Sequence, residues 1–254
     1  MLASQRHNQI QALLRENGAV TVAGLMETFG ISMETARRDL AAMEKAGLLG
    51  RVHGGALPLD SAELYRPLRD RRHLQQTAKN AIARVAADFV QEKDCISVSG
   101  GSTALAFALE LRKRFRQLTV ITYGLDVLDA LRDMPEYTVM FTGGAYFADE
   151  NVCVGPGTVR FLSSVYVQKA FIFPSMLSLE KGITSHTAPS PQIQTMIRQS
   201  DHVYVLADNT KFQKSSLYEV SPMRRDFTYI TDKDLPQALR KKYAQHQLHF
   251  VYAE

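Results

Sequence analysis

Residues 32–40, SMETARRDL, combine side chains that can read nucleic acid. Ala36 and Leu40 are four residues apart, as on one face of a helix, so the polar side chains fall on the other faces. Arginine hydrogen-bonds to guanine edges or to phosphates, and serine and threonine contact either. We therefore expect a helix that offers four side chains to DNA: Ser32, Thr35, Arg37 and Arg38. A solvent-exposed helix without a ligand would show the same pattern.

A glycine-containing hairpin is expected just after this helix, where residues 51–56 read RVHGGA. The pairs Leu48-Leu49 and Arg51-Val52 indicate two short strands around a glycine turn. Glycine allows the backbone to approach a phosphate chain closely, and arginine and histidine supply hydrogen-bond donors. We expect DNA contacts from Arg51, His53 and Gly54, although an ordinary glycine hairpin would have the same sequence.

Three predicted helices position these residues. Thr21 and Ser32 have the side chains that cap the start of a helix, and Gly30 is placed to end the second helix. A short turn containing Gly30 lets the third helix leave at the steep angle that a DNA-reading helix pair needs. With the hairpin, these helices predict a winged helix-turn-helix domain over residues 1–57. The helices are expected over residues 5–16, 22–29 and 33–46.

The sequence pattern of the rest of the chain is typical of an α/β domain. Residues 58–78 contain two prolines and many charges, which indicates a linker and the start of a connecting helix. Beyond it, short apolar strands alternate with amphipathic helices, so residues 79–254 predict a mostly parallel sheet with helices on both faces. The expected strands are residues 95–100, 118–124, 137–144, 169–175, 202–208, 227–232 and 248–253.

The loop after the first of these strands could bind an anion. Residues 99–103 read SGGST and open a predicted helix. Glycines expose backbone N–H groups, the hydroxyls of Ser102 and Thr103 add donors, and a helix N-terminus carries partial positive charge. The loop therefore predicts a phosphate or carboxylate site, and a plain strand-to-helix turn is an equally good interpretation.

Residues 31–56 resemble the N-terminal signature of the DeoR family of bacterial transcriptional regulators. That signature has a Ser-x-x-Thr-x-Arg-Arg-Asp-Leu helix followed by Leu-Glu-x-x-Gly and Arg-x-His-Gly-Gly-Ala, and Met43 stands where leucine is usual. The resemblance implies a DNA-binding regulator, most often a repressor, of a carbohydrate-metabolism operon. The matching residues are Ser32, Thr35, Arg37, Arg38, Asp39, Leu40, Glu44, Gly47, Arg51, His53, Gly54, Gly55 and Ala56.

The C-terminal part is similar to the sensor domain of that family, which is related in fold to ribose-5-phosphate isomerase. The carboxyl ends of parallel strands meet at one edge of a sheet, so the resemblance implies that the matching loops line one effector pocket. These loops are residues 99–103, 122–124, 142–144, 182–184 and 206–212. Lys211 is expected to pair with an anionic effector, unless it is an exposed lysine bonded to Asp208. The implied effector residues are Ser99, Gly100, Gly101, Ser102, Thr103, Tyr123, Gly143, Gly144 and Lys211.

Several residues depart from the family pattern. Ser99 replaces the usual acid, Tyr123 replaces asparagine, and residues 173–175 replace a small strand end. Residues 183–194 lack the glutamate that the family commonly has there. A sugar-phosphate isomerase needs a carboxylate base near a lysine, so we expect binding and no turnover. The loss of acids favours a phosphorylated sugar or a sugar acid as the effector.

Two other functions stay open: an isomerase-like enzyme, and a helix-turn-helix protein whose C-terminal domain only forms oligomers. A net charge of +4 permits a nucleic-acid partner. The sequence contains no apolar run of about 18 residues and no signal peptide, and Cys95 and Cys153 lack metal-ligand spacing. We therefore expect a cytoplasmic homodimer or homotetramer that binds operator DNA and a small effector and needs no cofactor, metal or membrane.

Overall fold

The computed structural model describes residues 1–52, 54–59, 67–186 and 191–254. Contacts within it divide the chain into two units. The first unit comprises Met1–Arg66, Ser175–Ser190 and Gln213–Pro222, and the second comprises Pro67–Pro174, Pro191–Phe212 and Met223–Glu254. Each unit is described by itself below.

The three helices expected at the start of the chain are present in the first unit: α1 (Ala3–Asn17), α2 (Val22–Phe29) and α3 (Met33–Lys45). The expected caps are confirmed, because the side chains of Thr21 and Ser32 accept hydrogen bonds from the backbone N–H groups of Gly24 and Thr35. Gly30 ends α2 in the left-handed conformation that glycine adopts without strain. The helices enclose a small core that includes Ile10, Leu14, Leu25, Leu40 and Met43.

The hairpin after α3 differs in part from the prediction. The strand expected at Leu48-Leu49 is wrong, because those residues form the turn that follows α3. The wing consists of β2 (Gly50–Val52) and β3 (Gly55–Leu57), and β3 also pairs with β1 (Val20–Thr21), in the order β1-β3-β2. The wing is therefore held by strand pairing to β1, which directly precedes α2.

A second small sheet belongs to the same unit. It consists of β10 (Met176–Ser178), β11 (Gly182–Ser185) and β13 (Tyr218–Ser221), which pair antiparallel in the order β10-β11-β13. Residues 182–184, expected as a loop, are therefore strand residues. Their carbonyl and amide groups are used in pairing, which corrects the prediction that this segment is a pocket loop.

The second unit is built on a seven-stranded sheet in which every pairing is parallel. All seven segments expected as strands lie in this sheet, which confirms the predicted fold class. Their order is β15-β14-β12-β9-β4-β5-β6. The bounds are β4 Cys95–Val98, β5 Thr119–Thr122, β6 Thr138–Phe141, β9 Val167–Ile172, β12 Ser200–Leu206, β14 Thr228–Asp232 and β15 His249–Ala253.

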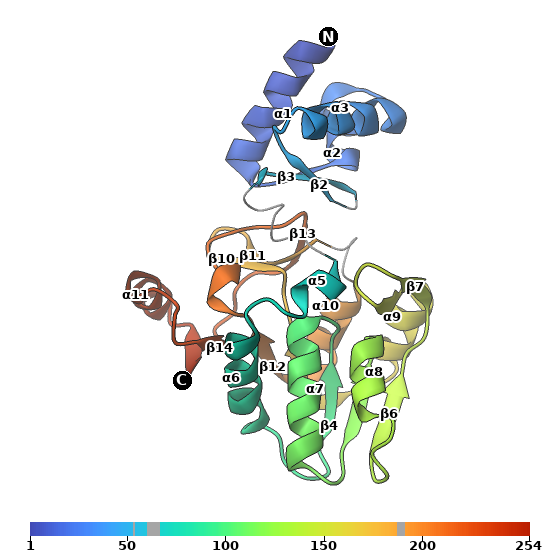
Figure 1. The fold of residues 1–254 in the computed structure, drawn as a ribbon, viewed down its shortest axis with the longest axis vertical. Coiled ribbons are helices and arrows are strands. Elements are labelled where there is room, and N and C mark those ends of the chain that lie inside the picture. Colours follow the sequence, from blue (N-terminus) through green and yellow to red (C-terminus); the bar gives the residue numbers. More distant parts are fainter. Residues whose placement is uncertain (53, 60–66, 187–190) are drawn as a thin grey trace. The chain divides into compact units, whose positions relative to one another are not determined.

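Helices cover both faces of this sheet (Figure 1). One face is covered by α6 (Gln76–Ala87), α7 (Ser102–Arg114) and α8 (Leu125–Leu131), which bury Ile82, Phe107 and Leu111 against the strands. The other face carries α9 (Pro156–Ser163), α10 (Pro191–Arg198) and α11 (Gln237–Gln245). Two smaller pieces complete the unit: α5 (Leu68–Arg71) and the hairpin of β7 (Ala145–Phe147) and β8 (Val152–Val154).

The strand order identifies the position at which a ligand is expected in a sheet of this kind. From β4 the chain moves through β5 to β6 on one side, whereas β9, β12, β14 and β15 fill the other side. In open parallel sheets, ligands bind outside the carboxyl ends of the strands where the order reverses. Here that point lies between β4 and β9, which are neighbours.

Candidate functional site

Helix α3 presents most of the side chains that we predict to contact DNA to solvent. Ser32, Arg37 and Arg38 are exposed, and Thr35 is half-buried. Ser32 Oγ accepts a hydrogen bond from the Thr35 backbone N–H at 3.2 Å, and the two hydroxyls lie 3.0 Å apart. Among the described residues, neither guanidinium has an ion-pair partner. Both arginines are therefore available to an anionic partner.

The third residue of the Arg-Arg-Asp sequence has a different environment. Asp39 is buried, and its carboxylate accepts hydrogen bonds from Arg6 Nε at 2.5 Å and Arg6 Nη2 at 2.9 Å. His7 Nε2 lies 3.1 Å from Asp39 Oδ1. Asp39 thus links α3 to α1 through these hydrogen bonds. The helix that carries Arg37 and Arg38 is therefore held in place against α1. Sequence reasoning matched Asp39 to the family signature but did not find this role, because its partners lie more than 30 residues away.

The wing holds Arg51 close to α3. The Arg51 backbone N–H donates to Glu44 Oε1 at 2.9 Å, and its guanidinium lies 3.8 Å from the Glu44 carboxylate. Gly54 has a φ of +90°, a conformation that favours glycine. His53, which was also predicted to contact DNA, lies outside the described residues.

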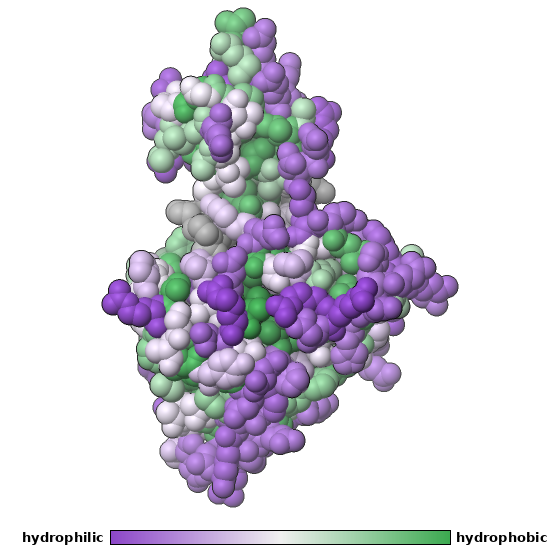
Figure 2. Space-filling model, turned by 180° about the vertical axis from the view of Figure 1, so that it is seen from behind, coloured by the Kyte–Doolittle hydropathy of each residue, from purple (hydrophilic) through white to green (hydrophobic). Residues whose placement is uncertain are grey.

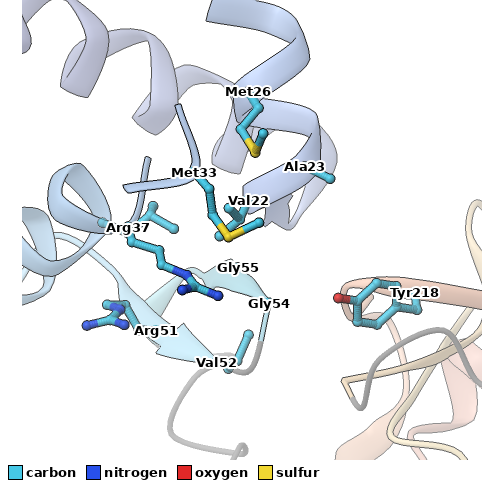
Figure 3. A pocket seen from close by; sticks show the side chains of 11 residues that line it. Val22, Ala23, Met26, Met33, Arg37, Arg51, Val52, Gly54, Gly55 and Tyr218 are labelled. Atoms are coloured by element: carbon cyan, nitrogen blue, oxygen red, sulfur yellow. The ribbon is translucent and has the colours of Figure 1, made fainter. Parts of the chain in front are cut away.

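Arg37 and Arg51 share a hollow between α3 and the wing. Figure 3 shows the two side chains in this hollow, together with Met33 and the wing glycines Gly54 and Gly55. The hollow has a volume of about 480 Å³, and its walls are partly apolar. Two guanidiniums that line one open hollow favour an anionic occupant such as a phosphate backbone.

Ser99 and Tyr123, two of the predicted effector residues, contact each other. Ser99 lies at the end of β4 and is completely buried; its hydroxyl accepts a hydrogen bond from the Phe173 N–H at 3.3 Å. Burial raises the pKa of the Tyr123 phenol, which is hydrogen-bonded to Ser99 and to the Gly100 backbone. The serine that replaces the family's acid and the tyrosine that replaces its asparagine are therefore partners. Both side chains are buried and form hydrogen bonds within the protein.

The backbone of the loop from Gly100 to Thr103 has features that an anion site would need. Gly101 precedes α7 with a φ of +131°, and no side chain of the described residues caps this helix. The first N–H groups of a helix have no intrahelical acceptor and attract anions. Ser102 is half-buried, whereas Thr103 is buried. An anion would thus meet backbone N–H groups and the Ser102 hydroxyl.

Gly143 and Gly144 lie farther along the same edge, after β6. The Gly143 carbonyl accepts a hydrogen bond from Thr158 Oγ1 at 2.7 Å, and Gly144 packs tightly against Thr158 and Val154. Neighbouring strands are about 4.8 Å apart, and four such steps separate β6 from β12, which leads to Lys211. These glycines follow a strand that is two positions away from β4 in the sheet.

Lys211 lies after β12 on a short 3-10 turn, Asn209–Lys211, and is half-buried. The turn is fixed from both sides: the Asp208 carboxylate accepts from the Thr210 N–H at 3.0 Å, and the Asp232 carboxylate accepts from the Asn209 N–H at 2.7 Å. Since the turn is held in place by two buried carboxylates, the position of the Lys211 backbone is well defined.

Lys79 is a nearby lysine that sequence reasoning did not single out. It lies in α6 with an exposed fraction of 3%. Its burial lowers its pKa to about 8, an effect that Asp208 opposes and that Lys211 and Arg71 increase. Lys79 therefore interacts electrostatically with Asp208 and Lys211, which follow β12. Nothing in the sequence pattern of this amphipathic helix distinguishes Lys79 from an exposed lysine, so its burial was not predicted.

The described residues contain no group of histidines, cysteines and carboxylates that could hold a metal ion. They also contain no helix long and apolar enough to cross a membrane. The end of the second unit that is lowest in Figure 2 is largely hydrophilic. Helix α7 ends there with a basic run whose Arg112 and Arg114 pair with Asp133, Asp88 and Glu110, so this run is used in surface ion pairs.

Comparison with known proteins agrees with this arrangement. Residues 6–62 match the DeoR-like helix-turn-helix domain, and residues 74–233 match the DeoR C terminal sensor domain. Ribose 5-phosphate isomerase A from Methanocaldococcus jannaschii overlaps 55% of this chain and 55% of its own, with a TM-score of 0.40 and 18% identity, which is too distant to assign an activity.

Curated relatives match along almost the whole chain. The HTH-type transcriptional regulator GolR of Listeria innocua is 31% identical over 255 residues, covering 100% of both chains. The transcriptional repressor AccR of Agrobacterium fabrum is 32% identical and covers 94% of this chain and 95% of its own. A putative aga operon transcriptional repressor of Escherichia coli is 28% identical and covers 94% and 91%. These relatives are regulators and not enzymes, and the chain belongs to the DeoR family of transcriptional regulators.

Proposed function

We propose that this regulator is a repressor that binds operator DNA through α3 and the wing. One observation carries the proposal: Arg37 and Arg38 are exposed side by side on a helix that the buried Asp39 braces against α1. Arginine pairs with guanine edges in the major groove or clamps phosphates. Arg51 and Gly54 in the wing supply backbone-positioning contacts beside them, and we retain His53 as a predicted contact.

A gel-shift titration on candidate upstream DNA tests the role of the helix. We expect Arg38→Ala to weaken specific binding about tenfold to a hundredfold, because a bidentate arginine–base pair contributes about 1–3 kcal/mol. Lys45→Ala is a matched control, since it removes one positive charge from the exposed C-terminal end of the same helix. Retained operator affinity in the Arg38 variant would exclude Arg38 from DNA recognition.

The effector that fits the second unit best is a phosphorylated or acidic sugar. Three features support an anion near the carboxyl ends of β4 and β9: the uncapped N-terminus of α7, the Ser102 hydroxyl, and the cationic side chain of Lys211 on its fixed turn. Ser99 offers no charge there, so it would not repel an anion. Binding of such an effector to one arrangement of the protein would shift the population toward or away from the DNA-competent state. We propose release from DNA.

A thermal-shift panel of sugar phosphates, sugar acids and neutral sugars tests this effector class. A true effector stabilises the folded protein in proportion to its occupancy. We expect Lys211→Ala to reduce the shift about tenfold in apparent affinity while DNA binding is kept. Lys241→Ala, on the exposed face of α11, is the control. Tight binding to neutral sugars alone would contradict the anionic effector.

The assembly proposed here is a homodimer or homotetramer that reads paired half-sites. A single small head rarely buries enough surface for tight specific binding, so two recognition helices one DNA turn apart are expected.

A further inference from the structure

The segment Gln213–Pro222 belongs to the same unit as the winged helix, although its sequence lies within the match to the sensor domain of the family. It contains β13, in which Tyr218 pairs with Ser185 of β11. The Ser216 N–H also donates to Thr184 Oγ1 at 2.9 Å, which holds the start of the segment against β11. The sensor sequence therefore contributes a segment to the unit that carries the DNA-binding residues.

Three glycines of the winged helix each face one side chain of residues 215–218. A Cβ atom built on any of these glycines would lie less than 3.0 Å from that side chain, an approach that only glycine permits. The pairs are Gly18 with Ser215, Gly54 with Tyr218 and Gly55 with Leu217. Since these contacts involve both the end of α1 and the wing, they set the position of Tyr218 within the unit.

Tyr218 also lines the hollow that holds Arg37 and Arg51. Figure 3 shows its hydroxyl directed toward Gly54 of the wing. The side chain is half-buried, and among the described residues its hydroxyl has no hydrogen-bond partner. Burial raises the pKa of this phenol, so the hydroxyl keeps its proton at neutral pH and can donate. The hollow therefore has a neutral donor in addition to its two guanidiniums.

We propose that Tyr218 donates a hydrogen bond to a DNA phosphate that occupies this hollow together with Arg37 and Arg51. Phosphate oxygens accept hydrogen bonds from tyrosine as well as from arginine, and such contacts position a protein on the duplex without reading its sequence. The proposal rests on the DNA-binding function proposed above. It adds that a residue of the sensor sequence completes the phosphate contact of the winged helix.

Fluorescence anisotropy of the full-length protein on candidate upstream DNA and on scrambled DNA tests the hydroxyl. We expect Tyr218→Phe to weaken both by about threefold to tenfold, because one hydrogen bond to a charged acceptor is lost while the ring is kept. The slope of log K against log salt should not change, since no cation is removed. Tyr166→Phe is the control, because it removes a hydroxyl from a tyrosine of the second unit that is 61% exposed. Wild-type affinity in Tyr218→Phe would overturn the proposal, and so would tighter binding, which is expected of a ring that blocks the hollow.

A change on the DNA side separates a phosphate contact from a structural role of the hydroxyl in the wing. Neutral methylphosphonates, placed at successive positions of the duplex, remove one phosphate charge and one acceptor oxygen at a time. At the contacted phosphate, we expect the substitution to weaken binding of the wild type at least threefold more than binding of Tyr218→Phe, because the two changes remove the same bond. Equal losses at every position would show that the hydroxyl acts only through the fold of the wing, which would overturn the proposal.

Arg51→Ala in the same assays distinguishes failure of this proposal from failure of the DNA-binding function on which it rests. Weaker binding by Arg51→Ala, with wild-type binding by Tyr218→Phe, would remove the tyrosine contact and leave the DNA-binding function standing. If neither variant changes the affinity for either duplex, no DNA phosphate occupies the hollow, and the proposed role of the wing fails together with that of Tyr218.

Discussion

Arg37, Arg38 and Asp39 are adjacent in the sequence but have different environments. Arg37 and Arg38 are exposed, whereas Asp39 is buried between α3 and α1. Burial raises the pKa of the Asp39 carboxyl, but the hydrogen bonds from Arg6 and His7 outweigh this effect and hold the pKa below its ordinary value. The charged form of Asp39 thus stabilises the domain that carries the arginines.

We predict that Asp39→Asn lowers the stability of the winged helix by about 3 kcal/mol, because the buried guanidinium of Arg6 loses its ionic partner. Hydrogen exchange over residues 3–17 in the full-length protein measures this loss. Glu34→Gln, an exposed acid in the first turn of the same helix, should change stability by less than about 0.5 kcal/mol.

The pH dependence gives this prediction a second test. Since the pKa of Asp39 is lowered in the folded state, its contribution is complete above the ordinary carboxyl pKa of about 4 and is lost as the pH falls through the folded value. The difference between wild type and Asp39→Asn should therefore shrink on acidification. A difference that stays constant down to pH 2 would show that the charge of Asp39 does not matter.

The wing depends on a close approach between β1 and β3. A Cβ atom on Gly55 would lie 2.0 Å from the carbonyl oxygen of Val20, a backbone atom that cannot move without breaking the strand pair. We predict that Gly55→Ala destabilises the winged helix by about 1–3 kcal/mol, as overpacking does, and weakens operator binding. Thermal unfolding and gel shift measure the two effects.

Gly157 in α9 provides the matched glycine control. A Cβ atom there would meet nothing within 4 Å, and its φ is not in the left-handed region. Gly157→Ala should leave stability unchanged or raise it slightly. If Gly55→Ala behaves in the same way, the tight β1–β3 contact does not position the wing.

Sequence reasoning succeeded for elements whose signals are local. The caps at Thr21 and Ser32 and the apolar spacing of α3 lie within a few residues of what they determine. The strand at Leu48-Leu49 was wrong because two adjacent leucines fit a helix-terminating turn as well as a strand. The pairing of β1 with β3 joins residues about 35 positions apart, and no local pattern records it.

The same distinction holds for the whole chain. The seven parallel strands were predictable because strands buried on both faces form apolar runs. The order that sets β9 beside β4, and the bonds that turn Ser99 toward Phe173 and Tyr123, depend on packing between distant segments. Consequently the sequence predicted the strands of this sheet, while the contacts of residues 67–74 and the burial of Lys79 required the structure.

Charge distribution over the chain sets how the regulator should respond to salt. The net charge is only +4, and residues 1–56 hold six basic and five acidic residues, so DNA affinity must come from a few placed cations. We predict that Arg51→Ala lowers the slope of log K against log salt by about 0.9 for each bound head and weakens operator and scrambled DNA by the same factor. Arg38→Ala should weaken operator far more than scrambled DNA, because base contacts carry the specificity. Fluorescence anisotropy across a salt series separates the two behaviours, with Arg132→Ala on the exposed end of α8 as the control. An unchanged slope in the Arg51 variant would mean that the wing does not contact phosphate.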